Sequence, residues 1–434
     1  GQLTPFTLYL PCLLATLGCV MVIYGMALRY FGWAAALWGG TLYLGNYLVA
    51  RQICLARTDT LFSFTVALTA VLGFHAWRRG KGWTWFWLTA ALASLTKGPL
   101  GLVLGAGGLL AALWESRTKP APIKGTHLPG IALFVALTFG WLAAACTWGG
   151  EDVFDKLIRK ELMNPTYDEP WARPPLYARV WIPALYLLGR FLPASLFTTL
   201  GCWRVIRHPA RPASGYESAE SGTHKPANAL APNTSCVVRA DDERRFERFL
   251  FCWLALGLVI FAFPKHQRAD LLMPLLPPAA ILAGRELARL TRRFSRRRIL
   301  TAATAVCAVL FTIYGWYSYH VARAENELVK QTVVLRDLAK RMQREHPVHP
   351  PLVHMDTPFT LQFYLNTKDP LVSPDEAARR LSATTAVWVA VWDYPKLLAA
   401  FGPGRPHLYE VAQGPQSGEA LVRVMSNQIP SEQK

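Results

Sequence analysis

Charge is scarce in this sequence: Asp, Glu, Lys and Arg together make up 17% of its 434 residues. A soluble domain carries nearer a quarter. Four long stretches, residues 1–28, 98–114, 128–150 and 299–319, contain no charged residue. Apolar runs of about 17–25 residues are long enough to cross a bilayer. A whole series of them excludes an ordinary soluble fold, and the sequence predicts an integral membrane protein.

Cysteine patterns that bind metals are also lacking. The eight cysteines lie mostly within apolar runs, and none forms a C-x-x-C pair or another metal-binding spacing. This excludes a zinc ribbon and a dithiol redox centre. The cysteines are predicted to be small core residues.

Acidic residues are few, 28 against 46 basic residues, and the net charge of +18 raises the question of a nucleic-acid partner. However, the basic residues lie in short clusters between apolar runs, which is the pattern of loops retained in the cytoplasm. The cluster RELARLTRRFSRRR (285–298), which precedes an uncharged run, is the clearest example. We therefore predict no nucleic-acid partner.

Placing the basic clusters on the cytoplasmic side gives ten spans that alternate from end to end, with residues 1–320 as a membrane domain. The fold class predicted is a polytopic α-helical membrane protein. Within it, residues 204–248 have the Pro, Ser, Ala and Gly content of a disordered cytoplasmic loop. The spans are expected at about residues 6–28, 33–50, 60–77, 83–96, 98–114, 128–148, 180–202, 249–264, 271–284 and 299–319.

The tail, residues 321–434, is predicted to be a separate soluble α/β domain on the side of the membrane opposite the basic clusters. A helix is expected over residues 328–342, and strands over 352–355 and 386–392. Ser373 and Glu376 form an S-x-x-E capping box that should begin another helix. The segment HLYEVA is expected to supply the final strand, and the tail lacks a Gly-rich phosphate loop.

The stretch ARTDTLF (56–62) places Arg57 and Asp59 between two apolar runs. A charged side chain at the centre of a membrane helix costs about 2.5–3.5 kcal/mol. A basic side chain at a helix end can reach the interface, whereas the short carboxylate of Asp59 cannot reach far. Asp59 also suits the N-cap of the following span. We predict that both residues mark the rim of a charged, aqueous site on the outer face.

Several other connections bring ionisable residues to the same face. The pattern suits an anionic amphiphile, with a phosphate held by Lys and Arg and a lipid tail among the spans. Asp59 is the carboxylate best placed for acid–base chemistry. The candidate binding residues are Arg57, Lys97 in LTKGPLG, Glu161, Asn164 and Arg173 in the long loop 149–179, and Lys265 and Arg268 in FPKHQRAD.

Four segments together resemble a known family. ARTDTLFSF, LTKGPLGLVL, ELMNPTYDEPWARPPLYARVWIP and PKHQRADLLMPLLPPAA occur in the order and spacing of GT-C glycosyltransferases that use polyprenyl-phosphate sugars. The sequence is most similar to the lipid A aminoarabinose transferases and the protein mannosyltransferases. The tail segment YLNTKDPLVSPDEAARRL also resembles the periplasmic domain of the former.

This resemblance implies a function at the bacterial inner membrane. A sugar on undecaprenyl phosphate would be transferred at the periplasmic face, with inversion, to lipid A, a protein or a glycan. Asp59 matches a family aspartate that can share a divalent metal with an acid of the first periplasmic loop, Lys97 matches the lysine of the TKG turn, and Lys265 matches a residue that handles the carrier phosphate.

The match is incomplete at two places. The first-loop acid would precede Gly1, and the chain begins without Met or a cleavable leader, so we expect a fragment lacking the true N-terminus. The aminoarabinose enzymes read Lys-Leu-Pro-x-Tyr where this chain has Gln267 to Leu271, and Arg268 is expected to replace the lost lysine.

Two other classes of function remain open. A transporter or flippase for an anionic lipid would use the same basic residues, but it is expected to show internal repeats and ionisable groups at mid-membrane. A non-catalytic binder of a polyprenyl lipid would also use these residues. Asp59 distinguishes these classes, because a binder can lose the carboxylate and a transferase cannot.

Overall fold

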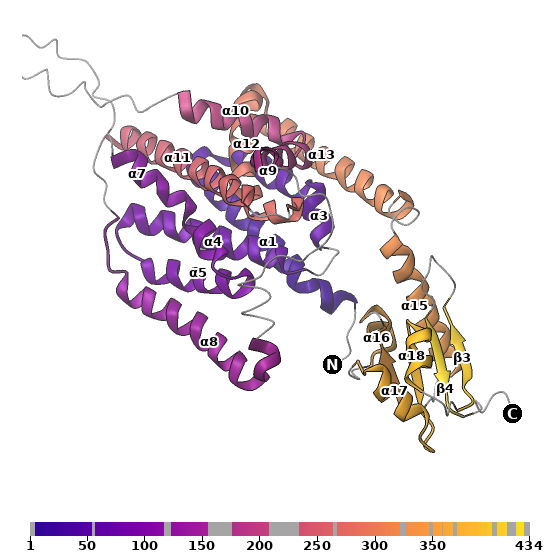
Figure 1. Ribbon diagram of the computed structural model, residues 1–434. Helices are drawn as coiled ribbons and strands as arrows, with labels where there is room; N and C mark the ends of the chain where they lie inside the picture. Colours follow the sequence, from indigo (N-terminus) through magenta and orange to yellow (C-terminus); the bar gives the residue numbers. More distant parts are fainter. Residues whose placement is uncertain are drawn as a thin grey trace, which may run out of the picture. The chain divides into compact units, whose positions relative to one another are not determined.

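The structure is a computed structural model that describes residues 5–53, 57–116, 123–154, 176–207, 234–263, 267–321, 327–346, 350–357, 359–367, 371–401, 406–414 and 422–428. The chain divides into two compact units, one of residues Phe6–Phe311 and one that comprises Thr312–Lys434 and the first five residues. The first unit is helical, and the second contains a small sheet (Figure 1).

Helices lie over every predicted span, but four of the predicted spans are not single α-helices. The span predicted at 33–50 is two helices, the spans at 98–114 and 271–284 each contain a 3-10 segment, and the span at 180–202 is divided by a turn at residues 191–193. The helices are α1 (Pro5–Phe31), α2 (Trp33–Leu44), α3 (Tyr47–Ile53), α4 (Asp59–Arg79), α5 (Trp83–Lys97), α6 (Leu100–Ala106), η1 (Gly107–Leu109), α7 (Leu110–Ser116), α8 (Leu128–Phe154), α9 (Leu176–Arg190), α10 (Ala194–Arg207), α11 (Thr234–Ala262), η3 (Ala269–Leu275), α12 (Leu276–Leu290), η4 (Thr291–Arg293) and α13 (Arg296–Trp316).

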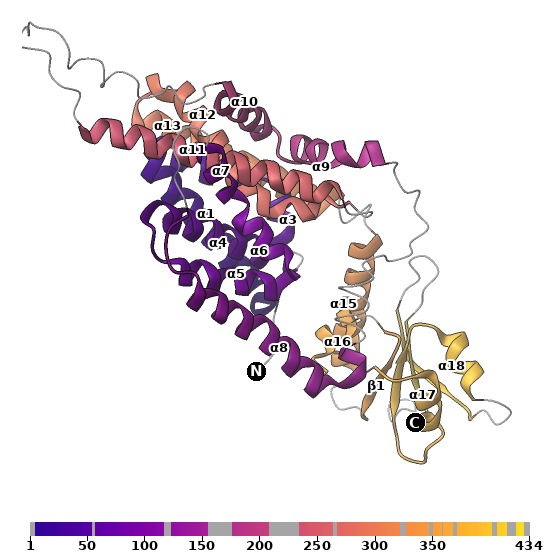
Figure 2. The ribbon, with the colours of Figure 1, turned by 60° about the vertical axis from the view of Figure 1, so that its left-hand side comes forward.

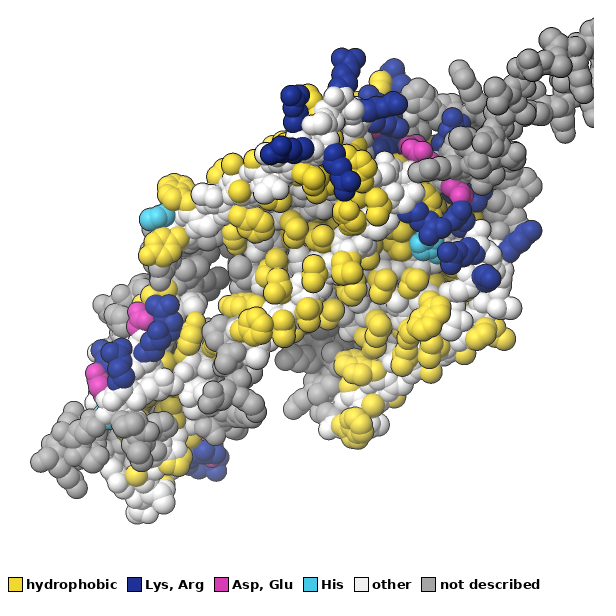
Figure 3. Space-filling model, turned by 180° about the vertical axis from the view of Figure 1, so that it is seen from behind, with side chains coloured by type: hydrophobic (Ala, Val, Ile, Leu, Met, Phe, Trp, Pro, Cys, Tyr) yellow, Lys and Arg dark blue, Asp and Glu magenta, His cyan; other side chains and the backbone are white. Residues whose placement is uncertain are grey.

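Within the described ranges, five helical stretches are long and apolar enough to cross a bilayer: Tyr9–Phe31, Asp59–Arg79, Leu128–Trp148, Ala269–Arg293 and Arg296–Trp316. Two of them are almost uncovered, since 6% of the residues in the stretch of α8 and 11% of those in α13 are buried. A soluble protein would bury such helices, whereas a membrane protein turns them to lipid. Figure 3 shows one face on which hydrophobic side chains cover the helical unit.

Close helix contacts hold the bundle together. Helices α2 and α12 cross where Gly39 meets Gly284, and a Cβ added to Gly284 would lie 2.5 Å from the Gly39 nitrogen. Small residues at such a crossing let the two backbones approach. Helix α8 lies against α5 at the edge of the bundle (Figure 2).

The predicted bounds of the disordered loop, residues 204–248, are wrong at both ends, where the structure has helix. Helix α10 continues to Arg207, and α11 begins at Thr234; residues 208–233 lie outside the described part of the chain. The charged first half of α11 lacks the apolar periodicity that predicts a helix, but ion pairs to other helices hold it. Arg78 Nε of α4 lies 3.0 Å from Asp242 Oδ1, and Arg245 Nε lies 3.0 Å from Glu115 Oε2 of α7.

A denser cluster of charges joins α10, α11 and α12. Glu286 of α12 has no exposed side-chain surface, and its carboxylate pairs with Arg204 of α10. It also accepts hydrogen bonds from Arg285 Nη2 at 2.7 Å and Arg289 Nη1 at 2.9 Å. Arg285 in turn pairs with Glu247 of α11. We call these five residues the Glu286 cluster; it replaces the solvated flank that the sequence predicts from residue 285.

The second unit is an α/β domain, as predicted, with one strand that the sequence analysis missed. The sheet order is β1-β2-β4-β3; β1 and β2 are parallel, and β4 pairs antiparallel with both β2 and β3. The elements are α15 (Glu327–Glu345), β1 (Leu352–Met355), α16 (Phe359–Leu365), α17 (Pro374–Leu381), β2 (Trp388–Val391), α18 (Tyr394–Ala400), β3 (Tyr409–Gln413) and β4 (Arg423–Ser426). The missed strand β4 is only four residues long, yet it lies between β2 and β3.

The predicted capping box of α17 shows the hydrogen bond to the Ser373 side chain, whereas the Glu376 side chain pairs with arginines. Ser373 Oγ accepts a hydrogen bond from the Glu376 backbone N–H at 3.3 Å. The Glu376 carboxylate pairs with Arg379 and Arg380. These two cations, with the Arg380 hydrogen bond as the larger effect, lower the pKa of Glu376 below its ordinary value of 4.5.

Candidate active site

Asp59 and Lys97, predicted separately, form one ion pair. Asp59 is the first residue of α4 and Lys97 is the last residue of α5, and the Lys97 Nζ contacts Asp59 Oδ1. The two helices run side by side (Figure 1) and are joined by a short turn at Gly80, whose left-handed conformation ends α4. This hairpin brings the start of one helix to the end of the other.

The helix end and an aromatic ring surround the pair. Asp59 lies in the first turn of α4, where the helix dipole stabilises a negative charge. The Lys97 ammonium also lies 5.5 Å from the centre of the Phe62 ring, a cation–π distance. The Asp59 side chain is 9% exposed and that of Lys97 is 25% exposed. A largely desolvated carboxylate that an ammonium orients can accept a proton or balance a developing positive charge.

The turn after Lys97 depends on glycine. Gly98 has φ +70°, a left-handed conformation that glycine adopts without strain, and it ends α5. Pro99 follows and α6 begins at Leu100, which separates Lys97 from the next helix. The sequence motif LTKGPLG therefore predicts correctly that Lys97 lies at a helix end.

A second group of charges lies near the start of α4. Asp270, at the start of η3, contacts two arginines: Arg57 Nη1 lies 3.1 Å from Oδ2, and Arg51 Nη1, at the end of α3, lies 3.6 Å from Oδ1. The Ser63 hydroxyl of α4 donates to the Met273 carbonyl at 3.0 Å, which ties η3 to α4. The three charged residues thus come together from three separate elements.

Arg51 and Asp270 were not among the predicted site residues. Arg51 was visible as a positive charge on the face where positive charge is disfavoured. Asp270 was visible as part of the departure from the family motif. Their pairing spans more than two hundred residues, and nothing in the local pattern indicates it.

The structure describes some of the remaining candidates and not others. Arg268 is exposed and directly precedes η3, and the adjacent Gln267 is anchored through Nε2 to the Arg179 carbonyl at 3.0 Å. The other predicted residues lie outside the described part of the chain: Glu161, Asn164, Arg173 and Lys265.

The described residues do not fit a divalent metal centre. A hard cation takes several oxygen ligands, and across the described ranges no three His, Cys, Asp or Glu side chains gather to hold a metal. The Asp59 carboxylate has an ammonium as its partner. No step of the reaction below is therefore assigned to a metal.

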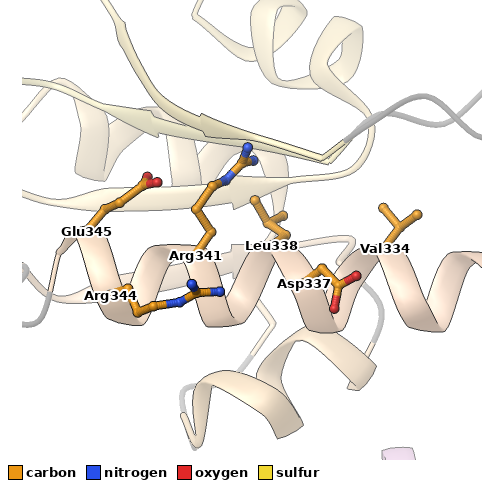
Figure 4. Close-up of a pocket in the computed structure, with 6 residues that line it drawn as sticks. All are labelled: Val334, Asp337, Leu338, Arg341, Arg344 and Glu345. Atoms are coloured by element: carbon orange, nitrogen blue, oxygen red, sulfur yellow. The ribbon is translucent and has the colours of Figure 1, made fainter.

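The second unit contains a separate groove of about 400 Å³ along α15. Arg341 points from the helix toward the strands (Figure 4), and its Nη2 donates to the Gln413 carbonyl at 2.6 Å. The two arginines of the groove are offset by two carboxylates, so it has no net charge with which to attract an ion. The lining residues are Val334, Asp337, Leu338, Arg341, Arg344 and Glu345.

Comparison with known proteins finds one sequence family and one solved protein to which this chain is similar. Residues 1–143 match the sequence model of the dolichyl-phosphate-mannose-protein mannosyltransferase family. A crystal structure of ArnT from Cupriavidus metallidurans bound to undecaprenyl phosphate is similar, with a TM-score of 0.66 at 16% sequence identity; the match covers 97% of this chain and 84% of that chain. The apo structure of the same protein gives a TM-score of 0.60 at 16% identity, covering 97% and 83%. No curated protein sequence matches significantly.

These likenesses confirm the predicted resemblance and the fold class. The chain is a multi-pass membrane protein, and its fold, with a helical unit and a small C-terminal sheet, is similar to that of ArnT. The predicted number of spans stays a prediction, since five helices meet the length and composition required of a span.

Proposed function

We propose that this protein transfers a sugar from a polyprenyl-phosphate carrier to a lipid A, protein or glycan acceptor. The observation that carries the proposal is the Asp59–Lys97 pair, in which the carboxylate is 9% exposed and the ammonium 25% exposed. It lies within a fold whose solved counterpart holds undecaprenyl phosphate. A phosphate with a lipid tail suits basic groups at the ends of apolar helices.

The reaction assigned to this site is a single inverting displacement. The acceptor oxygen forms a bond to the anomeric carbon while the bond from that carbon to the carrier phosphate oxygen breaks. Both electrons of the broken bond leave with the phosphate, which becomes a polyprenyl phosphate monoester. When the acceptor is a hydroxyl, Asp59 takes its proton; a phosphate acceptor needs no such step.

Each predicted residue has a place in this scheme. Lys97 balances and orients Asp59, and its ammonium is available to the phosphate as negative charge grows there. Arg57, Arg268 and Lys265 bind the carrier phosphate. The long-loop residues Glu161, Asn164 and Arg173 contact the sugar or the acceptor.

The orientation follows from the separation of charges along the bundle. Asp59 begins the 21-residue helix α4, and Arg78 and Arg79 end it, about 30 Å further along its axis. Basic residues gather at that far end, together with the Glu286 cluster. Because basic residues are retained in the cytoplasm, we assign Asp59 to the periplasmic face of the inner membrane. Residues 1–320 would form the catalytic membrane domain and 321–434 a periplasmic domain.

The proposal is tested with the complete gene product in membranes that contain labelled undecaprenyl-phosphate sugars. Transfer of label to an acceptor by the wild type and its loss in Asp59→Asn, with lipid binding retained, is the expected result. Movement of intact labelled lipid across the bilayer without transfer indicates a flippase instead. Binding of the lipid with neither transfer nor movement indicates a non-catalytic binder. The Arg78→Gln variant, altered at the far end of α4, is the matched control and should retain transfer.

A further inference from the structure

Asp270 occupies a position between two arginines that suits a phosphate. Its two carboxylate oxygens each contact one guanidinium, Oδ2 with Arg57 at 3.1 Å and Oδ1 with Arg51 at 3.6 Å. Guanidinium groups bind carboxylates and phosphates through the same planar pattern of N–H donors. The two oxygens of the Asp270 carboxylate therefore contact the same N–H donors that two oxygens of a bound phosphate would contact.

The exposure of the three side chains indicates which of them can move. Asp270 is 12% exposed, whereas Arg51 and Arg57 are 42% and 45% exposed. Asp270 begins η3, whose following residues Leu272 and Met273 are buried. The carboxylate is therefore fixed by its backbone, and the two long arginine side chains are free to turn toward another acceptor.

The arginines also retain donors for such an acceptor. A guanidinium carries five N–H donors, and in the described part of the chain each arginine contacts the carboxylate through a single nitrogen, Nη1. In both pairs the arginine is nearly half-exposed, and ion pairs at a surface contribute about 0.2–1 kcal/mol. A ligand with greater negative charge can replace such a partner.

We propose that Arg51 and Arg57 form a seat for the carrier phosphate and that Asp270 competes with the phosphate for this seat. The inference rests on the proposed function and adds Arg51 and Asp270 to the site. Before the carrier binds, Asp270 holds the arginines together; when it binds, they turn from the carboxylate to the phosphate oxygens. No covalent bond changes in this exchange.

Asp270 should compete more strongly with the product of the reaction than with the donor. The sugar-bearing donor is a phosphodiester with one negative charge, whereas the released carrier is a monoester with a charge of about −1.5 to −2 at neutral pH. The fixed charge of Asp270 repels the product more strongly than the donor. Asp270 therefore favours release of the spent carrier over loss of the donor.

The test measures binding of labelled undecaprenyl phosphate to the full-length protein in nanodiscs. Asp270→Asn keeps the shape and an acceptor oxygen but removes the charge, so we expect binding about two- to fivefold tighter. We expect Arg51→Gln and Arg57→Gln each to bind about tenfold more weakly. Asp242→Asn is the matched control, since it neutralises a carboxylate that also pairs with an arginine, at the far end of α4; it should bind as the wild type does.

Inhibition of sugar transfer by added undecaprenyl phosphate provides a second readout. The inhibition should become two- to fivefold stronger in Asp270→Asn, and the KM for the donor should change less. A merely structural role of Asp270 would not produce this difference between product and donor. Weaker binding in Asp270→Asn would overturn the inference, because Asp270 would then position the arginines rather than compete. Unchanged binding in Arg51→Gln would also overturn it. A wild type that binds no undecaprenyl phosphate would instead refute the proposed function itself.

Discussion

Removal of either partner of the Asp59–Lys97 pair should have unequal effects on stability and equal effects on transfer. Lys97→Gln leaves the Asp59 carboxylate, 9% exposed, without its cation. Breaking a buried pair in this way costs about 3–5 kcal/mol. Asp59→Asn leaves an ammonium that is 25% exposed and can reach water, so we expect a cost of about 1 kcal/mol. The double variant should be more stable than Lys97→Gln alone.

Transfer should follow a different pattern, because the two groups act as a unit. Loss of a positioned base lowers a rate by about 10²–10⁴. We expect either single substitution to cause a loss of this size, and the double variant to be no slower than the worse single variant.

Initial rates of label transfer from undecaprenyl-phosphate sugar and thermal unfolding in detergent measure the two effects on the same preparations. The reasoning fails if Asp59→Asn transfers within about twofold of the wild type for a hydroxyl acceptor. Asp59 would then be a helix-end residue of α4 and not the base. It fails equally if the fold-loss in transfer rate of the double variant equals the product of the two single fold-losses, because the two groups would then act independently.

Three further predictions concern other parts of the chain. In Gly284→Ala, the new Cβ would lie 2.5 Å from the Gly39 backbone nitrogen, so α2 and α12 must separate, and we expect a lower thermal midpoint by about the 1–3 kcal/mol typical of overpacking; an unchanged midpoint would contradict the close crossing. Glu286→Gln removes the charge that three arginines share and should destabilise the bundle by about 3–5 kcal/mol, which detergent unfolding would reveal, whereas a neutral effect would indicate that the arginines are solvated. The pKa of Glu376, measured by carboxyl 13C NMR, should lie below 4.5 and move back toward it in Arg380→Gln. Because the folded-state pKa is lowered, the stability that this interaction contributes is present above the unfolded-state pKa and is lost as the pH falls through the folded-state pKa.

Much of the membrane fold could be predicted because long apolar runs have few alternative structures. The breaks within those runs were harder to place. Helix α2 ends at Leu44, and Asn46 Oδ1 accepts hydrogen bonds from the Leu48 and Val49 backbone N–H groups at the start of α3. A single Gly-Asn pair is a weak signal within an otherwise apolar run. The first half of α11 was missed for the opposite reason, since its helix depends on charges that find partners on other helices. The strand β4 was missed although β1 and β2 are equally short, because β4 begins with Arg423 and ends with Ser426 and so lacks the continuous apolar run of β2.

The site was predicted residue by residue but not as an arrangement. Asp59 and Lys97 stood out because each places a charge where the neighbouring sequence is apolar. Their ion pair follows from the α4–α5 hairpin, which only the packed structure reveals. The role of Asp270 depends on contacts across more than two hundred residues, and sequence patterns of one chain carry no information at that separation.

The Glu286 cluster has a consequence for how the protein is made. The Glu286 carboxylate has no exposed surface and the adjacent Arg285 is also buried, so neither charge is stable without the partners that other helices supply. The ribosome produces α10 with Arg204 first, then α11 with Glu247, and α12 last. The cluster can be complete only after α12 has been made, so we expect the final packing of α10 and α11 to follow the insertion of α12.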